Sequence, residues 1–264
     1  MKITDYYLTP DEKPLDRLVS DGGMTGIFRT IACVGDSLSS GEFEDVDANG
    51  VKTYHDMFDY SWGQYMARMA GCKVYNFSRG GMSAAEYCQR FAQANGFWDR
   101  DKLANAYVIA LGVNDIQNNM AFPMGTTDDI CPDDWQQNKP TFAGYYAQII
   151  QRYAAMQKGA HFFLVTIPAS PHHAAAREQR ADEHAALLYA IARFFGEDHV
   201  HVIDLRQYAP AYDEEFYRNF FMGGHMNAAG YLLTAKMVSS YIDYIVRRSP
   251  EQFNRVGFIG TDRA

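Results

Sequence analysis

Long apolar runs are missing from this sequence. A helix that crosses a bilayer needs about 20 consecutive apolar residues, and no stretch of the chain approaches that length. The opening residues, MKITDYYLTPDEKPLDRL, carry charges where a signal peptide needs an apolar segment. These absences argue against a membrane partner and predict a cytoplasmic protein.

Clusters of basic residues are also missing. Lysine and arginine are scattered along the chain, and the formal net charge is −8. A polyanion would therefore meet repulsion over most of the surface. The sequence predicts that nucleic acid is not a partner.

Cysteine is scarce, and histidine follows no metal-binding pattern. The four cysteines show no C-x-x-C spacing, which predicts reduced, structural thiols rather than a disulfide framework. The histidine spacings match no standard metal site, so we expect solvated histidines and neither a metal nor an organic cofactor. The residues concerned are Cys33, Cys72, Cys88, Cys131, His172, His173, His184, His199 and His201.

Short apolar runs that alternate with helical patterns are abundant. The runs begin at Thr30, Lys73, Ala106, His161 and His201. Helices are expected over 60–71 and 141–159, behind a capping-box pattern at 83–86, and after an N-cap at 227. This alternation predicts one α/β domain over 1–264, a three-layer α/β/α sandwich with a five-stranded, mainly parallel sheet.

Two segments fall outside that alternation. Residues 1–28 form an N-terminal extension, and 115–140 form a long loop rich in Asp, Asn and Pro. Loops of that length often act as lids or binding loops, so we expect this one near the active site. Its aromatic residues, Phe122 and Trp135, would either stack on a sugar or acyl group or anchor the loop.

Small and polar residues follow the predicted strands. GDSL at 35–38 follows the first strand, YNFSRGG at 75–81 covers the second strand and its end, and GVND at 112–115 follows the third. GGHMNAAGY at 223–231 places a histidine on a glycine-rich loop. In open parallel sheets, ligands bind outside the carboxyl ends of the strands, so these segments are expected to form one crevice.

These four segments, in this order, resemble the blocks of the SGNH (GDSL) hydrolase family of esterases, lipases and acylhydrolases, from Ile31 to about Tyr231. The resemblance implies a flavodoxin-like fold with Ser37 as nucleophile and His225 as general base. It also implies an oxyanion hole made by the Ser37 N–H, the Gly81 N–H and the Asn114 side-chain amide.

The chemistry of these residue types agrees with the resemblance. A serine hydroxyl attacks an ester only when a neighbouring imidazole takes its proton, and His225 is the candidate. The resulting oxyanion needs preorganised donors, each typically worth about 3 kcal/mol. Asp36 is expected to support the turn by hydrogen bonds rather than to react.

One position departs from the family pattern. Family members usually carry an aspartate three residues before the histidine, and here that position is Met222. We favour a Ser-His dyad in which a backbone carbonyl of 222–224, around Gly223, orients the imidazole. The other possibility is that an acidic residue from elsewhere in the chain orients the imidazole, and the candidates are Asp204, Asp213, Glu214 and Glu215.

The sequence therefore predicts a serine ester hydrolase that forms an acyl-enzyme on Ser37. Short acyl or acetyl esters, those of carbohydrates included, are the expected substrates. The alternative, which Met222 supports, is a non-catalytic module that binds carbohydrates or esters on the same scaffold.

Overall fold

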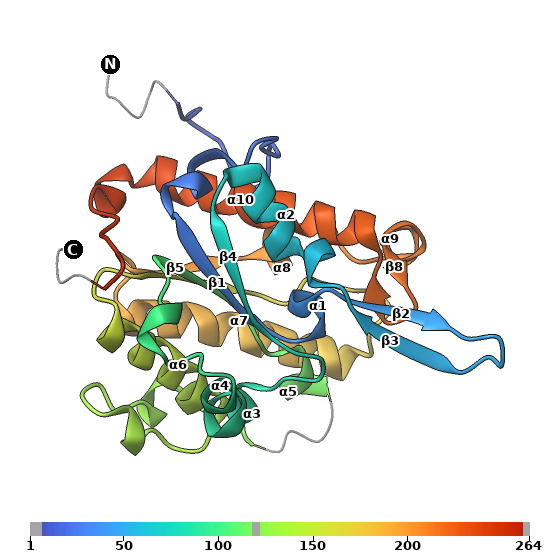
Figure 1. Ribbon diagram of the computed structural model, residues 1–264, viewed down its shortest axis with the longest axis horizontal. Helices are drawn as coiled ribbons and strands as arrows, with labels where there is room; N and C mark the ends of the chain where they lie inside the picture. Colours follow the sequence, from blue (N-terminus) through green and yellow to red (C-terminus); the bar gives the residue numbers. More distant parts are fainter. Residues whose placement is uncertain (1–6, 118–121, 261–264) are drawn as a thin grey trace.

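The computed structural model describes residues 7–117 and 122–260, so 1–6 of the extension and 118–121 of the long loop lie outside the described residues. The central sheet is parallel and has five strands in the order β4-β1-β5-β6-β7 (Figure 1). Every apolar run predicted as a strand forms one. The strands are β1 (Thr30–Gly35), β4 (Lys73–Ser78), β5 (Ala106–Ala110), β6 (His161–Val165) and β7 (Val200–Ile203).

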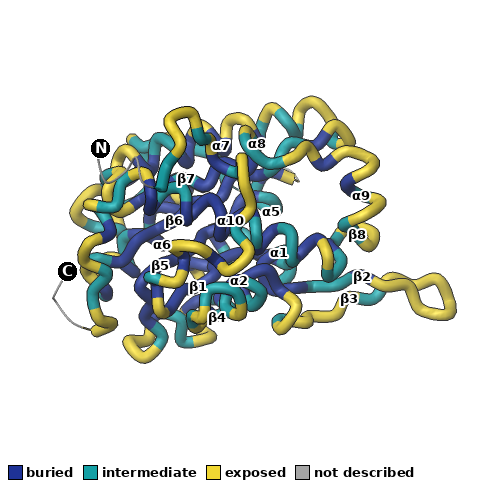
Figure 2. Tube along the Cα trace, turned by 90° about the horizontal axis from the view of Figure 1, so that it is seen from above, coloured by how far each residue is buried: buried dark blue, intermediate teal, exposed yellow. Residues whose placement is uncertain are grey.

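Alternate residues of each strand face opposite helical layers. In β1, Ile31 and Cys33 pack in the cluster under α2 (Trp62–Ala70) and α10 (Ala228–Arg248). Ala32 and Val34 pack in the cluster under α6 (Phe142–Met156) and α7 (Ala175–Phe195). The strands β1, β5 and β6 are buried from both sides (Figure 2), which confirms the three-layer α/β/α prediction.

Side-chain caps fix where α2, α6 and α10 begin, whereas α7 has no side-chain cap. The Ser61 hydroxyl accepts the Gln64 N–H ahead of α2, and the Asn227 side chain accepts the Gly230 N–H ahead of α10. Gly71 ends α2 with a left-handed φ of 64°. No helix in the described part of the chain is long and apolar enough to cross a bilayer. The shorter helices are α1 (Ser37–Ser40), α3 (Ala84–Glu86), α4 (Ala92–Ala94), α5 (Val113–Gln117), α8 (Leu205–Tyr208) and α9 (Glu214–Phe220).

Two antiparallel hairpins lie outside the central sheet. Strands β2 (Glu42–Val46) and β3 (Lys52–Asp56) form a hairpin that projects from the body of the molecule (Figure 1). It has a narrow base, because the Met57 N–H donates to the Gly41 carbonyl at 2.9 Å. Strands β8 (Phe221–Met222) and β9 (His225–Met226) form a smaller hairpin.

Two of the histidines expected to be solvated are buried. His184 lies inside the α7 layer with its Nε2 3.1 Å from the Leu111 carbonyl oxygen, and His201 lies on β7 against His161. Burial lowers the pKa of His184 to about 4 and that of His201 to about 3. The solvated interpretation is therefore wrong for this pair, because helix packing and sheet stacking cover both rings.

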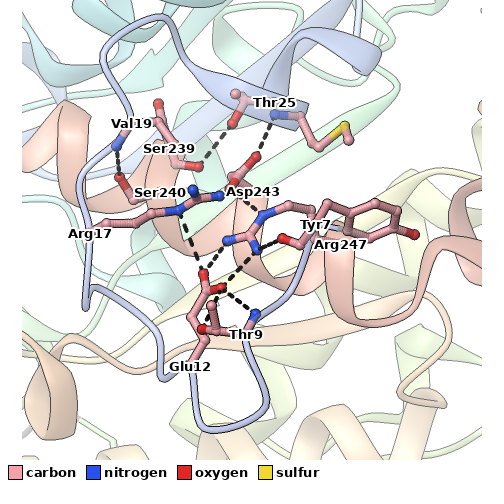
Figure 3. Close-up of polar contacts among 12 residues, drawn as sticks. Tyr7, Thr9, Glu12, Arg17, Val19, Thr25, Ser239, Ser240, Asp243 and Arg247 are labelled. Atoms are coloured by element: carbon pink, nitrogen blue, oxygen red, sulfur yellow. Dashed lines mark hydrogen bonds and ion pairs between the residues drawn. The ribbon is translucent and has the colours of Figure 1, made fainter. Parts of the chain in front are cut away.

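The N-terminal extension is tied to α10 by a buried ion-pair network (Figure 3). The Arg247 guanidinium donates to Asp243 at 2.7 Å and also binds the carboxylate of Glu12. Its Nη1 donates to the Tyr7 carbonyl at 2.9 Å. The guanidinium holds the pKa of Glu12 below its ordinary value. One arginine thus connects the extension to the helix.

We expect Arg247→Met to lower the free energy of unfolding by about 3 kcal/mol, because two carboxylates lose their buried counter-charge. Urea denaturation measures the loss. Arg248→Met, which changes the exposed neighbour, is the control and should cost less than about 0.5 kcal/mol. Equal stability of the two variants would contradict the role given to the network.

Candidate active site

A cavity of about 390 Å³ opens beside the carboxyl ends of β1, β4 and β5. It brings together Ser37, Gly81, Asn114 and His225, which the sequence predicts to share one site. Its other lining residues are Glu42, Tyr54, Asp56, Arg79 and Gly80.

Ser37 is the first residue of α1, directly after β1. The side chain of Asp36 caps this helix by accepting the Leu38 N–H at 3.0 Å. A Cβ at Gly35 would collide with the Ser39 side chain, so glycine is needed there for close packing. Asp36 is buried, and burial raises its pKa to about 7. The local fold thus presents the Ser37 side chain to the cavity and keeps Asp36 inside.

Two backbone N–H groups at the cavity are available to a ligand. The N–H groups of Ser37 and Gly81 carry no hydrogen bond to any described residue. Gly81 has a left-handed φ of 72°, a conformation that glycine adopts without strain. Free backbone donors at this position suit an oxyanion.

Asn114 connects the two loops that flank the nucleophile. Its Nδ2 lies 3.1 Å from the Met82 carbonyl and 3.4 Å from Oδ2 of Asp36. The next residue, Asp115, accepts the Ala84 N–H at 3.1 Å and so holds the start of α3. The GVND segment therefore fixes the glycine loop as well as supplying an amide to the cavity.

His225 lies on β9, and its ring is enclosed by side chains of the β2–β3 hairpin. Its Nε2 lies 3.0 Å from Oε1 of Glu42, and its Nδ1 lies 3.4 Å from Oε2 of Glu44. Tyr54 packs edge-on against the imidazole, with 5.6 Å between ring centroids. The described residues include no hydrogen bond between His225 and Ser37, because Nε2 is occupied by Glu42.

The Glu44 carboxylate is held on several sides. Only 5% of its side chain is exposed, its Oε2 accepts the Gly224 N–H at 2.9 Å, and its Oε1 lies 2.5 Å from Nζ of Lys52. The hydrogen bond from Lys52 is the main reason that the pKa of Glu44 falls below its ordinary value. A Cβ at Gly223 would collide with this carboxylate. The turn glycine thus makes room for Glu44.

Glu42 lies on the same strand face, two residues earlier, and its environment differs. Its carboxylate approaches Gly80 so closely that a Cβ there would collide with it. Partial burial raises the pKa of Glu42, and the ammonium of Lys52 contacts Glu44 instead. Across the cavity, Arg79 pairs with Glu86 at 2.6 Å.

Glu42 and Glu44 were not among the residues predicted for the site, and the group that faces His225 differs from the predicted backbone carbonyl. Among the described residues, no backbone carbonyl of 222–224 is hydrogen-bonded to the His225 ring, and Glu44 faces Nδ1 instead. Asp204 accepts hydrogen bonds from Thr166 and Tyr189, and Asp213 caps α9. Glu214 and Glu215 are exposed in the first turn of that helix.

The aromatic residues of the long loop contact α6. Phe122 packs against Tyr145 with 5.1 Å between ring centroids, and the guanidinium of Arg152 lies 4.7 Å from the Trp135 ring centroid. Neither aromatic residue belongs to the lining of the cavity at Ser37. Of the two alternatives, these contacts favour anchoring of the loop.

A parallel five-stranded sheet with a serine, a glycine loop, an asparagine and a histidine around one cavity defines the scaffold of a GDSL-type hydrolase. The model of the GDSL-like lipase/acylhydrolase family matches residues 33–233. The chain therefore belongs to this family of esterases and acylhydrolases.

Solved structures of carbohydrate esterases share the fold. A family two carbohydrate esterase from Clostridium thermocellum, in complex with cellohexaose, has a TM-score of 0.58 and 14% identity over 93% of this chain and 68% of its own. A family two enzyme from Corynascus thermopiles (Myceliophthora fergusii) has a TM-score of 0.57 and 17% identity over 83% and 66%. A carbohydrate acetylesterase from Sinorhizobium meliloti has a TM-score of 0.55 and 13% identity over 82% and 99%. No curated protein sequence matches the chain.

Proposed function

We propose that the protein hydrolyses short acyl or acetyl esters, those of carbohydrates included, through an acyl-enzyme on Ser37. The observation that carries this proposal is the single cavity shared by Ser37, Gly81, Asn114 and His225. A nucleophile, a base and oxyanion donors around one space are what acyl transfer requires.

The reaction follows from these positions. The contact between Nε2 of His225 and Glu42 breaks, and Nε2 then takes the proton of the Ser37 hydroxyl. The serine oxygen forms a bond to the ester carbonyl carbon. The oxyanion is stabilised by the N–H groups of Ser37 and Gly81. The Asn114 amide joins them when one of its two Nδ2 hydrogens leaves the Met82 carbonyl or the Asp36 carboxylate. The imidazolium then gives its proton to the leaving alcohol as the ester bond breaks. Water attacks the acyl-enzyme in the same way and frees Ser37.

The lining of the cavity supports a short acyl group and a polar alcohol. Carboxylates, an amide and a guanidinium surround the space, and they suit hydroxyl groups better than a hydrocarbon chain. A separate apolar cavity beside Leu38 and Val113 measures only about 80 Å³. Carbohydrate esterases among the structural neighbours are consistent with this choice.

The binding-module alternative rested on the missing aspartate. Glu44 now supplies a carboxylate at Nδ1 of the histidine, so Met222 no longer argues against catalysis. A module that only binds ligands would need no base beside the nucleophile.

We expect the protein to hydrolyse p-nitrophenyl acetate with a kcat/KM at least about tenfold higher than that for the octanoate, because the polar cavity offers little apolar surface to a long chain. Acetylated cellobiose, followed by acetate release, tests the carbohydrate part. Faster turnover of octanoate would contradict the short-acyl proposal. Binding of acetylated sugar without release, by correctly folded protein, would favour the binding module.

A further inference from the structure

We infer that Glu44 is the residue that positions His225, in place of the aspartate that the chain lacks. The inference rests on the proposed function, since it assigns the third member of the hydrolytic site. Glu44 comes from β2 on the projecting hairpin, whereas the usual acid lies three residues before the histidine.

The nitrogen that Glu44 faces is the one that a positioning acid must hold. A carboxylate that accepts the Nδ1–H bond fixes the tautomer in which Nε2 carries the lone pair. It also stabilises the imidazolium that forms when Nε2 takes the serine proton. Oε2 of Glu44 lies 3.4 Å from Nδ1, and 15% of the His225 side chain is exposed. This separation would shorten as the imidazolium forms.

The surroundings of Glu44 fix its position and its charge. The Gly224 N–H and the Lys52 ammonium occupy both carboxylate oxygens, and the Gly223 backbone packs against them. Lys52 also keeps the carboxyl ionised. A buried, charged acceptor with a fixed direction is suited to orienting a ring.

Glu42 cannot take this part, because it faces the opposite nitrogen. Nε2 must be free to accept the proton of Ser37, so the contact with Glu42 has to break before attack. Glu42 also lacks the lysine contact that Glu44 has. The two glutamates of β2 therefore differ in function. Glu44 orients the imidazole, whereas Glu42 must leave Nε2 before Ser37 can donate its proton there.

Position 222, where family members carry the aspartate, lies close to the His225 imidazole. Met222 pairs with His225 across the β8–β9 hairpin, so their side chains share one face. The methionine side chain is uncharged, and the residue is 40% exposed. A carboxylate placed at 222 would reach the imidazole from the β8 side, and this provides a test by relocation.

The decisive comparison is Glu44→Gln against Asp45→Asn. Each removes one negative charge from β2, and Asp45 is exposed on the other face of the strand. We expect Glu44→Gln to lower kcat about 10³-fold with KM changed less than threefold, by comparison with loss of the aspartate in serine proteases. Asp45→Asn should match the wild type. Thermal unfolding of both variants shows that the fold is retained.

Two readouts separate positioning from a structural role. The groups that face the imidazole are Glu42, Glu44 and Tyr54, with Lys52 behind Glu44 and Asp56 beside Glu42. Removing the Glu44 charge should move the acid limb of kcat/KM to lower pH, since the imidazolium is no longer stabilised. Adding Met222→Asp to Glu44→Gln should restore kcat at least about tenfold.

The outcomes distinguish the two proposals. An inactive wild type, equal to Ser37→Ala, overturns the proposed function itself. An active wild type with inactive Ser37→Ala, but equal rates for Glu44→Gln and Asp45→Asn, overturns the assignment of Glu44 alone. A loss in Glu44→Gln with an unchanged pH profile and no gain from Met222→Asp would make Glu44 structural, and this also overturns the inference.

Discussion

Ser37→Ala is expected to lower kcat for p-nitrophenyl acetate about 10⁵-fold, because Ser37 carries the one aliphatic hydroxyl among the described residues that line the cavity. The remaining rate would come from binding and from the oxyanion donors. His225→Ala should cost nearly as much, and the double variant should be no slower than either single variant, since the two residues act as one unit.

A neighbouring serine provides the control for this prediction. Ser39 is buried two residues further along α1, and its hydroxyl has no hydrogen-bond partner among the described residues. Ser39→Ala should keep both rate and fold. A fluorophosphonate should add one covalent label to the wild type and none to Ser37→Ala, as measured by intact mass. Label or turnover in Ser37→Ala would identify another nucleophile.

Asn114→Ala is expected to lower kcat about 10³-fold, or about 4 kcal/mol, because one oxyanion donor is lost at the transition state. KM should change little, since the charge on the carbonyl oxygen develops only during attack. Single-turnover acylation, measured by stopped flow, follows the affected step directly.

Asn105 is a matched control for the second prediction. It lies just before β5, where its side chain accepts the Thr30 N–H at 3.2 Å and donates to the Gly257 carbonyl at 2.8 Å. Asn105→Ala should lower stability and leave kcat unchanged. If Asn114→Ala lost stability but kept its kcat, the amide would only hold the Met82 loop and would not act as an oxyanion donor.

The sequence predicted the central sheet and the helices α2, α3, α6 and α10 because these depend on local signals. A strand buried on both faces has a nearly continuous apolar run, and this holds for β1, β5 and β6. Caps at Ser61, Ser83 and Asn227 are set by the side chain that precedes each helix. Such features need no knowledge of distant residues.

The β2–β3 hairpin escaped prediction because its sequence lacks a strand pattern. The segments EFEDV and KTYHD are mostly charged or polar, and only Glu44 is buried among them. What stabilises the hairpin is its pairing and the contact with β9, which sequence patterns do not show. Helix α7 and its buried His184 were missed for a related reason, since tertiary packing decides the burial of that ring.

The site was predicted in part. Ser37, Gly81 and Asn114 follow strands whose ends meet at one edge, so the topology brings them together. Glu44 lies 181 residues from His225 in the chain, and their contact depends on the position of a projecting hairpin. The only local signal was the spacing of Glu42 and Glu44, which places two carboxylates on one face of a strand.

The narrow base of the β2–β3 hairpin makes one side of the site a separable module. Glu42, Glu44, Tyr54 and Asp56 all lie between Gly41 and Met57, whose backbones are already hydrogen-bonded to each other at 2.9 Å. Excising 42–56 would therefore leave chain ends that a short turn can join. Combined with Met222→Asp, that deletion would place the acid three residues before the histidine, as in other family members. It would also open the cavity to bulkier alcohols. The hairpin is therefore a natural unit for redesigning selectivity.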